Sequence, residues 1–307
     1  MEQKFKVMLA RFPGGNSEHP AEVNFCINTT LACAFDTARV SQLEHWHLND
    51  TPVTMSRNRC VREAIARGAD ILIMVDSDMG PDLIKPQASF WARALDFIIS
   101  RYHQAPTMIA APYCGPPPHE NVYVFRWRNY ETGRQNPDYK LDQFKREEAA
   151  ERSGIEAVAA LPTGLIALDM RIFTGFQIGN EVVKLPPPWF YYEYTDEYQT
   201  DKSSTEDVAF SRDVHLLFGA YGLETVFVDW DTWAVHFKTK GVAKPHLIDP
   251  GGLARLFKQR SEGIEARAAV ETPGPVAPVS NGHGPAVVPK ADVARLKKIM
   301  EAQVTDA

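Results

Sequence analysis

Two carboxylates separated by one residue follow a run of five apolar residues. Asp76 and Asp78 come directly after residues 71–75, which show no polar alternation. Such a run is typical of a strand buried on both faces of a parallel sheet. At the end of a strand the chain bends into a loop, so both carboxylates can reach one cation, directly or through water. Hard oxygen ligands suit Mg²⁺ or Mn²⁺, which often bridge protein carboxylates to substrate phosphates.

The same residue types also have ordinary structural explanations. An Asp-x-Asp pair is common at polar strand exits and helix caps, although its position after a buried run and before the turn at residues 79–81 favours the metal. Ser204 and Asp207 have the spacing of a capping box with Asp in place of Glu, and acidic residues such as Glu206 favour a helix N-terminus. A lone histidine such as His236 is more often a satisfied core or surface group than a ligand.

The elements that must position these residues alternate between strands and helices. This order indicates an open α/β sheet, in which ligands lie at the carboxyl ends of the strands. The pattern predicts strands over residues 6–12, 71–75, 108–112, 157–161, 165–168 and 225–228, and helices over residues 21–38, 60–67 and 205–221.

Other segments do not belong to this alternation. Residues 114–150 and 186–204 are predicted to be excursions from the sheet, and the aromatic run in the second predicts a mobile loop over the site. Residues 261–289 are rich in Pro, Ala, Gly and Val and are interpreted as a linker. The expected organisation is one domain over residues 1–260, the linker, and a helical tail over residues 290–307.

The composition is that of an ordinary globular protein. The 307 residues are 44% hydrophobic and 23% charged, with a formal net charge of -6, so no attraction of the whole surface to nucleic acid or anionic lipid is expected. No apolar stretch approaches the roughly 20 residues that span a bilayer, and no secretory signal is visible. The four cysteines form no Cys-x-x-Cys pair and are interpreted as reduced thiols, which predicts a cytoplasmic protein without a membrane partner.

Several motifs, taken in order, resemble the GT-A glycosyltransferases. Ser56-Arg57-Asn58, a helix and the Asp76-Ser77-Asp78 strand end are similar to the family's Ala-Arg-Asn-like signature and Asp-x-Asp motif, with Ser56 in place of the usual Ala. The turn at Gly164, the Glu206-Asp207 pair and a late histidine, His236, continue the match over most of residues 4–240. The resemblance implies a GT-A fold, a Rossmann-like open mixed sheet flanked by helices, in a catalytic domain similar to family 2.

The resemblance also implies a donor site. A nucleotide-sugar, with UDP or GDP as its nucleotide, would be held through Mn²⁺ or Mg²⁺ bound by Asp76, Asp78 and His236. Arg57 and Asn58 would contact the diphosphate or brace the aspartates, which suits the planar donor fork of arginine. The residues implied to orient or closely approach the donor are Arg57, Asn58, Asp76, Gly164 and Lys238.

For the acceptor, the resemblance implies that Asp207 is the base of an inverting transfer, supported by Glu206. A retaining course would leave Asp207 with another role. The compact design and Pro-rich tail are similar to bacteriophage-encoded members, some of which glycosylate hydroxylated bases in phage DNA, and the compartment would then be the host cytoplasm. Saccharide and modified-DNA acceptors both stay open, and the net acidity slightly favours the saccharide. The residues that could contact DNA by stacking or by charge are Trp189, Phe190, Tyr191, Tyr192, Tyr194, Arg126, Arg128 and Arg134.

Three other classes remain as alternatives. A haloacid-dehalogenase-like phosphohydrolase also has Asp-x-Asp at a strand end, but it usually has Thr or Val where this chain has Met79. A nucleotidyltransferase would need a Gly-rich loop with Lys and Arg after the first strand, and residues 12–15 are too short for one. A catalytically inactive module that binds carbohydrate or a partner could use the same fold.

Overall fold

The structure is a computed structural model that describes residues 3–13, 19–48, 52–84, 88–115, 121–128, 141–195 and 202–237. Lys238, the predicted linker, the predicted helical tail and the end of the predicted domain lie outside the described residues. The helices are α1 (Pro20–Phe35), α2 (Val53–Ala66), α3 (Phe90–Arg101), α4 (Arg146–Ala150), α5 (Arg171–Thr174) and α6 (Glu206–Gly219).

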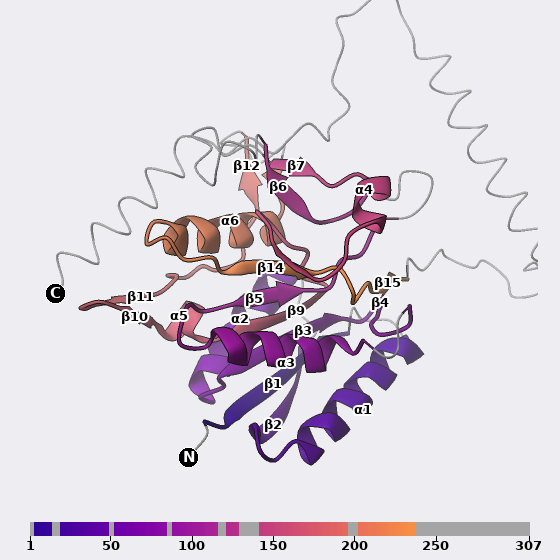
Figure 1. The fold of residues 1–307 in the computed structure, drawn as a ribbon, viewed down its shortest axis with the longest axis vertical. Helices are drawn as coiled ribbons and strands as arrows, with labels where there is room; N and C mark the ends of the chain where they lie inside the picture. Colours follow the sequence, from indigo (N-terminus) through magenta and orange to yellow (C-terminus); the bar gives the residue numbers. More distant parts are fainter. Residues whose placement is uncertain are drawn as a thin grey trace, which may run out of the picture. The chain divides into compact units, whose positions relative to one another are not determined.

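The core of the described part is a seven-stranded sheet in the order β2-β1-β3-β9-β5-β14-β8 (Figure 1). Strands β2, β1, β3, β5 and β14 run in one direction, whereas β9 and β8 run against their neighbours. The predicted open mixed α/β sheet is therefore confirmed. Its strands are β1 (Phe5–Phe12), β2 (Val40–His47), β3 (Ile71–Asp76), β5 (Met108–Ala110), β8 (Ile155–Ala157), β9 (Leu165–Asp169) and β14 (Val226–Asp229).

Shorter strands pair outside this sheet. They are β4 (Met79–Gly80) with β15 (Val235–His236), β6 (Phe125–Trp127) with β7 (Leu141–Gln143), β10 (Phe176–Ile178) with β11 (Glu181–Val183), and β12 (Glu193–Tyr194) with β13 (Lys202–Ser204). The β4–β15 pair matters most for the site, because it joins the segment after β3 to the segment after β14.

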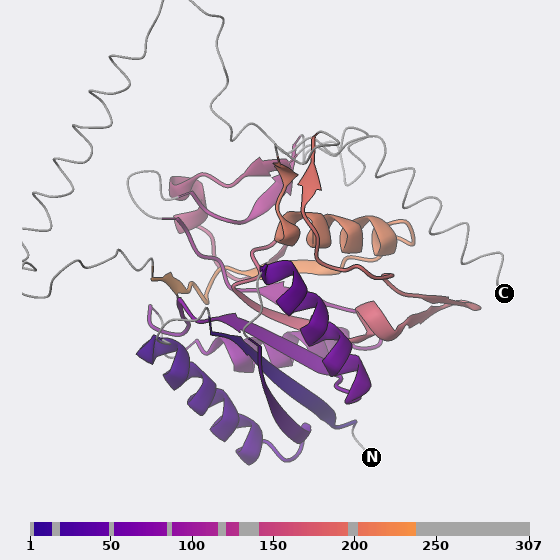
Figure 2. The ribbon, with the colours of Figure 1, turned by 180° about the vertical axis from the view of Figure 1, so that it is seen from behind.

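Helices cover both faces of the large sheet. Helices α1 and α3 pack on one face, and α2, α5 and α6 pack on the other (Figures 1 and 2). In β3, Ile71 and Ile73 belong to the first of these cores, while Leu72 and Met74 belong to the second. Both faces of the strand are buried, which explains why its sequence lacks polar alternation.

Some expected elements differ from the structure. Helix α3 and the edge strand β2 were not predicted, and β2 is half-exposed with polar residues on both faces. The strand predicted over residues 157–161 is mostly wrong, because β8 ends at Ala157. Beyond it, the N–H groups of Ala159 and Ala160 donate to the carbonyl of Phe125 instead of continuing the pairing with β14.

The prediction of a mobile loop fails for the first half of residues 186–204. Trp189 and Phe190 are 8% and 1% exposed and pack against Phe173 and Phe210. Farther along, Glu193 accepts two hydrogen bonds from the buried guanidinium of Arg212 on α6, at 2.6 and 2.8 Å. This part of the segment is therefore anchored in the core, while residues 196–201 lie outside the described residues.

The cysteine thiols agree with the prediction made from the sequence. All four cysteines are free, and three of them are buried. Burial raises the pKa of Cys33 to about 12, so this thiol stays protonated. No helix among the described residues combines the length and apolar character needed to span a membrane.

Truncation of β3 should reveal how much the two-sided core contributes to stability. Ile73 is fully buried, so Ile73→Ala should lower the free energy of unfolding by about 2–5 kcal/mol in urea denaturation. Ile27→Ala is the matched control, because Ile27 is 51% exposed on α1 and should change stability by no more than about 0.5 kcal/mol. Equal losses in both variants would contradict the described burial.

Candidate functional site

A buried arginine joins the end of β3 to the start of α6. Arg57 on α2 is 3% exposed, and its Nη2 lies 3.0 Å from Oδ2 of Asp76. Its Nη1 donates to Glu206, the first residue of α6. Of the two roles implied for Arg57, bracing an aspartate is the one seen in this geometry. The guanidinium fixes two carboxylates from distant parts of the chain in one place.

Negative charge exceeds positive charge in this region. Asp78 and Glu206 act on Asp76, and Glu206 also acts on Asp207. Among the described residues, Arg57 is the cation that interacts with Asp76, Glu206 and Asp207. Burial raises the pKa of Asp76, although 26% of its side chain is exposed and Arg57 opposes the shift. Burial and the charge of Glu206 also raise the pKa of Asp207. A further cation would therefore be stabilised here, and Asp207 is a stronger base than an ordinary aspartate.

Asp78 contacts the predicted late histidine. Strands β4 and β15 pair Met79 with His236, and the N–H of Phe237 donates to the carbonyl of Asp78 at 2.7 Å. This pairing brings Nε2 of His236 to 3.1 Å from Oδ2 of Asp78. The two residues that the resemblance placed together therefore do lie together, and their role as metal ligands stays a prediction.

The hydrogen bonding of His236 fits a cation between these two side chains. Nδ1 lies 3.3 Å from the carbonyl oxygen of Cys114, which can only accept, so Nδ1 carries the hydrogen. In the neutral ring Nε2 is then an acceptor, and it faces a carboxylate oxygen of Asp78, which is also an acceptor. Two acceptors at hydrogen-bond distance repel each other unless a proton or a metal ion lies between them.

The predicted set of three metal ligands does not form one cluster. Among the residues that the structure describes, no three His, Cys, Asp or Glu side chains are grouped so that they could hold a metal. The carboxylate of Asp76 binds Arg57, whereas that of Asp78 faces His236. The two carboxylates therefore have different partners, and Arg57 supplies the positive charge next to Asp76.

Gly164 is required by a neighbouring tyrosine. A Cβ at Gly164 would lie 2.7 Å from the hydroxyl oxygen of Tyr113, which accepts a hydrogen bond from the Gly164 N–H at 3.2 Å. The Tyr113 ring also lies 4.9 Å from the ring of His236. Burial raises the pKa of Tyr113 well above its ordinary value, so the phenol stays protonated. Tyr113 was not predicted as a site residue, and its position three residues after the end of β5 was the available signal.

Asn58 holds the aromatic segment against α2. Its Oδ1 accepts from the N–H groups of Trp189 and Phe190 at 2.9 and 3.1 Å. Its Nδ2 donates to the carbonyls of Thr54 and Phe190 at 2.8 and 2.7 Å. The amide therefore uses its hydrogen-bonding groups within the protein, in contrast to the implied role of orienting a donor. The other implied donor ligand, Lys238, lies outside the described residues.

The start of α6 is not the expected capping box. The N-cap is Thr205, and no side chain caps it. Asp207 instead accepts hydrogen bonds from the Thr205 hydroxyl and from the N–H of Val208. Because Ser204 lies outside the cap, the capping-box interpretation is wrong, and Asp207 instead satisfies one backbone N–H of the first turn by its contact with Val208.

The residues expected to contact DNA are mostly engaged within the protein. Trp189 and Phe190 are buried, and Arg126 and Arg128 pair with Glu148 and Asp142. Tyr191 donates a hydrogen bond to Asp213. The aromatic run is therefore not an exposed stacking surface at these positions. Arg134 lies outside the described residues.

The residues thus define an acidic site at the carboxyl edge of a mixed α/β sheet. No protein-family model matches the chain, and no curated protein sequence matches it either. Among solved structures, A197 from STIV is 12% identical over 76% of this chain and 86% of its own, with a TM-score of 0.46. A protein from Bacillus anthracis, described as a glucose-1-phosphate thymidylyltransferase in complex with a sucrose, is 10% identical over 76% and 89%, with a TM-score of 0.35. HddC from Yersinia pseudotuberculosis is 8% identical over 55% and 78%, with a TM-score of 0.26.

Removal of the Arg57 guanidinium should leave the buried Glu206 and the partly buried Asp76 without their cation. Arg57→Leu should lower the free energy of unfolding by about 3–5 kcal/mol at neutral pH. Without Arg57 the pKa of folded Asp76 rises further above 3.8, so protonation favours the folded state and the deficit should shrink as the pH falls toward that value. Urea denaturation at pH 5 and pH 7 tests this.

Arg57→Lys is the matched variant, because it keeps the charge and loses the planar fork. It should destabilise the protein less than Arg57→Leu does at pH 7. A deficit for Arg57→Leu that is the same at both pH values would mean that packing, and not charge, is what Arg57 supplies.

Proposed function

We propose that the protein is a metal-dependent glycosyltransferase that moves a sugar from a nucleoside-diphosphate sugar to an acceptor hydroxyl. One observation carries the proposal: Arg57 holds the carboxylates of Asp76 and Glu206 together, beside Asp207 and the Asp78–His236 pair. A transfer of this kind needs a place for a cation that binds a diphosphate and a base for the acceptor. The acidic site has candidates for both.

Asp78 and His236 are the residues that would hold the metal ion. Mg²⁺ commonly uses one or two protein carboxylates together with substrate phosphates, and Mn²⁺ also accepts imidazole, so two protein donors fit either ion. A bound divalent ion would neutralise the charge that develops on the leaving diphosphate. Asp76, which is bound to Arg57, contributes negative charge next to this ion.

Asp207 is the proposed base. Its raised pKa makes it suited to take the proton from the acceptor hydroxyl as that oxygen bonds to the anomeric carbon. The bond from the anomeric carbon to the diphosphate oxygen breaks in the same step, so the configuration inverts. Glu206 cannot serve in this way while it is paired with Arg57, and it acts as a support.

The acceptor is proposed to be a saccharide and not a hydroxylated base in DNA. Base stacking would need exposed aromatic faces, and Trp189 and Phe190 are buried. Phosphate binding would need available cations, and Arg126 and Arg128 are paired with carboxylates. The net charge of -6 also disfavours a polyanionic acceptor.

The role of Asp207 can be separated from a structural one by measuring transfer and donor binding together. Asp207→Asn should reduce transfer of a labelled sugar by about 10²–10⁴-fold, while the Kd for the donor stays nearly unchanged. Asp142→Asn is the control, because Asp142 forms a partly exposed ion pair on β7 and should keep full activity. Equal loss of transfer and donor binding in Asp207→Asn would argue against a base.

The metal assignment can be tested by thermal denaturation. Mn²⁺ and a UDP- or GDP-sugar together should raise the Tm of the unmodified protein more than either alone, because ligands that bind only the folded state stabilise it. Asp78→Ala should remove most of this joint effect. Absence of any nucleotide effect in the unmodified protein would favour the phosphohydrolase or the inactive binding module, and an undiminished effect in Asp78→Ala would exclude Asp78 as a ligand.

A further inference from the structure

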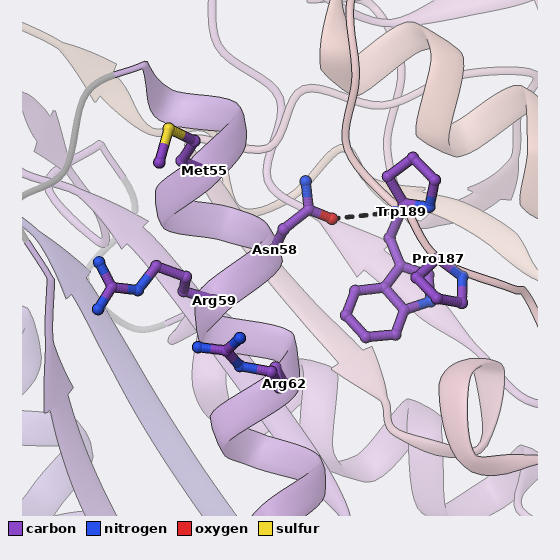
Figure 3. A pocket seen from close by; sticks show the side chains of 7 residues that line it. Met55, Asn58, Arg59, Arg62, Pro187 and Trp189 are labelled. Atoms are coloured by element: carbon purple, nitrogen blue, oxygen red, sulfur yellow. Dashed lines mark hydrogen bonds between the residues drawn. The ribbon is translucent and has the colours of Figure 1, made fainter.

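A pocket opens on the outer side of α2. It has a volume of 590 Å³ and lies between this helix and the segment that contains Trp189 (Figure 3). Its volume is in the range of about 300–1,000 Å³ that is usual for small-molecule sites. The lining residues are Met55, Asn58, Arg59, Arg62, Pro187, Pro188 and Trp189.

The wall opposite α2 is held in place before any ligand binds. Asn58 accepts hydrogen bonds from the backbone of Trp189 and Phe190, and the indole N–H of Trp189 donates to the carbonyl of Leu185 at 2.9 Å. The polar atoms of these residues are therefore used within the protein. The surface that remains available to a ligand is apolar. It includes Met55, which is 50% exposed.

The charge of the lining is positive. Arg59 and Arg62 are exposed on α2, and no carboxylate is among the lining residues. They lie three residues apart and so project from neighbouring positions on the helix surface. A phosphate or carboxylate at the rim would meet two guanidinium groups, whose planar donors match its oxygens.

This pocket carries positive charge, whereas the acidic site carries negative charge, and the two lie on opposite sides of α2. Arg57 and Arg59 lie about 200° apart around a helix of 3.6 residues per turn, and Arg57 faces Asp76 and Glu206. An anion at the acidic site needs a metal ion to offset the carboxylates around it. An anion at the outer pocket needs none.

We propose that this outer pocket binds a small ligand that combines an apolar ring or chain with a phosphate or carboxylate group. The apolar part lies on Met55 and Trp189, and the anion lies at Arg59 and Arg62. Binding here does not depend on whether the acidic site is a glycosyltransferase centre.

The test uses 1-naphthyl phosphate as the probe, titrated into the full chain by calorimetry with EDTA present to prevent metal-dependent binding at Asp78 and His236. The probe should bind, and inorganic phosphate should bind at least about tenfold more weakly because it lacks the apolar part. Arg62→Ala should weaken probe binding by about fivefold, the usual upper value for one exposed ion pair.

Two further variants make the result specific to the pocket. Arg67→Ala removes the same charge next to the end of α2, outside the lining, and should leave probe binding unchanged. Met55→Asp places a carboxylate in the pocket at the first turn of α2, where acidic residues are tolerated, and should weaken binding at least as much as Arg62→Ala. Absence of probe binding, equal effects of Arg62→Ala and Arg67→Ala, or unchanged binding in Met55→Asp would each overturn the proposal.

Discussion

The site depends on the burial of one guanidinium between two carboxylates. A buried charge is costly unless it is paired, so Arg57 stabilises only an arrangement in which Asp76 and Glu206 both reach it. These partners begin or end elements that are far apart in the chain. The Nε of Arg57 is buried without a hydrogen-bond partner in the described part of the protein. The position of the guanidinium is therefore set by its carboxylates and by the packing of α2.

Around this interaction the site divides into two halves joined by a short piece of chain. Arg57, Glu206 and Asp207 form a rigid half in which one carboxylate keeps a raised pKa. Asp78 and His236 form the other half, where Nε2 of His236 lies 3.1 Å from a carboxylate oxygen of Asp78. Residues 76–78 connect the halves, so a ligand bound at one lies within electrostatic reach of the other. In the proposed function the base, Asp207, therefore belongs to one half, and the metal ligands, Asp78 and His236, belong to the other.

The sequence was sufficient for features that depend on local pattern. Strand β3 could be predicted because burial on both faces demands an unbroken apolar run. The proximity of Asp78 and His236 followed only from the family resemblance, which placed them in one set with Asp76. The aromatic run at residues 189–190 was misjudged, because sequence alone does not distinguish an exposed loop from one packed against Phe173 and Phe210. The contacts of Tyr113 with Gly164, and of Asn58 with Trp189 and Phe190, join residues far apart in the chain, so position after a strand or in a motif marked the residues without revealing these partners.

The reversed strand β9 has a consequence for how the protein reaches its native state. It is the link in the large sheet between the trio β2-β1-β3 and the trio β5-β14-β8. Asp76 ends a strand of the first trio, while His236 follows a strand of the second. Until β9 inserts between them, the two trios share no backbone hydrogen bonds in that sheet. Such long-range pairing is slow to form, and the acidic site lies where the two trios are brought side by side, by β9 in the large sheet and by the β4–β15 pair beyond it.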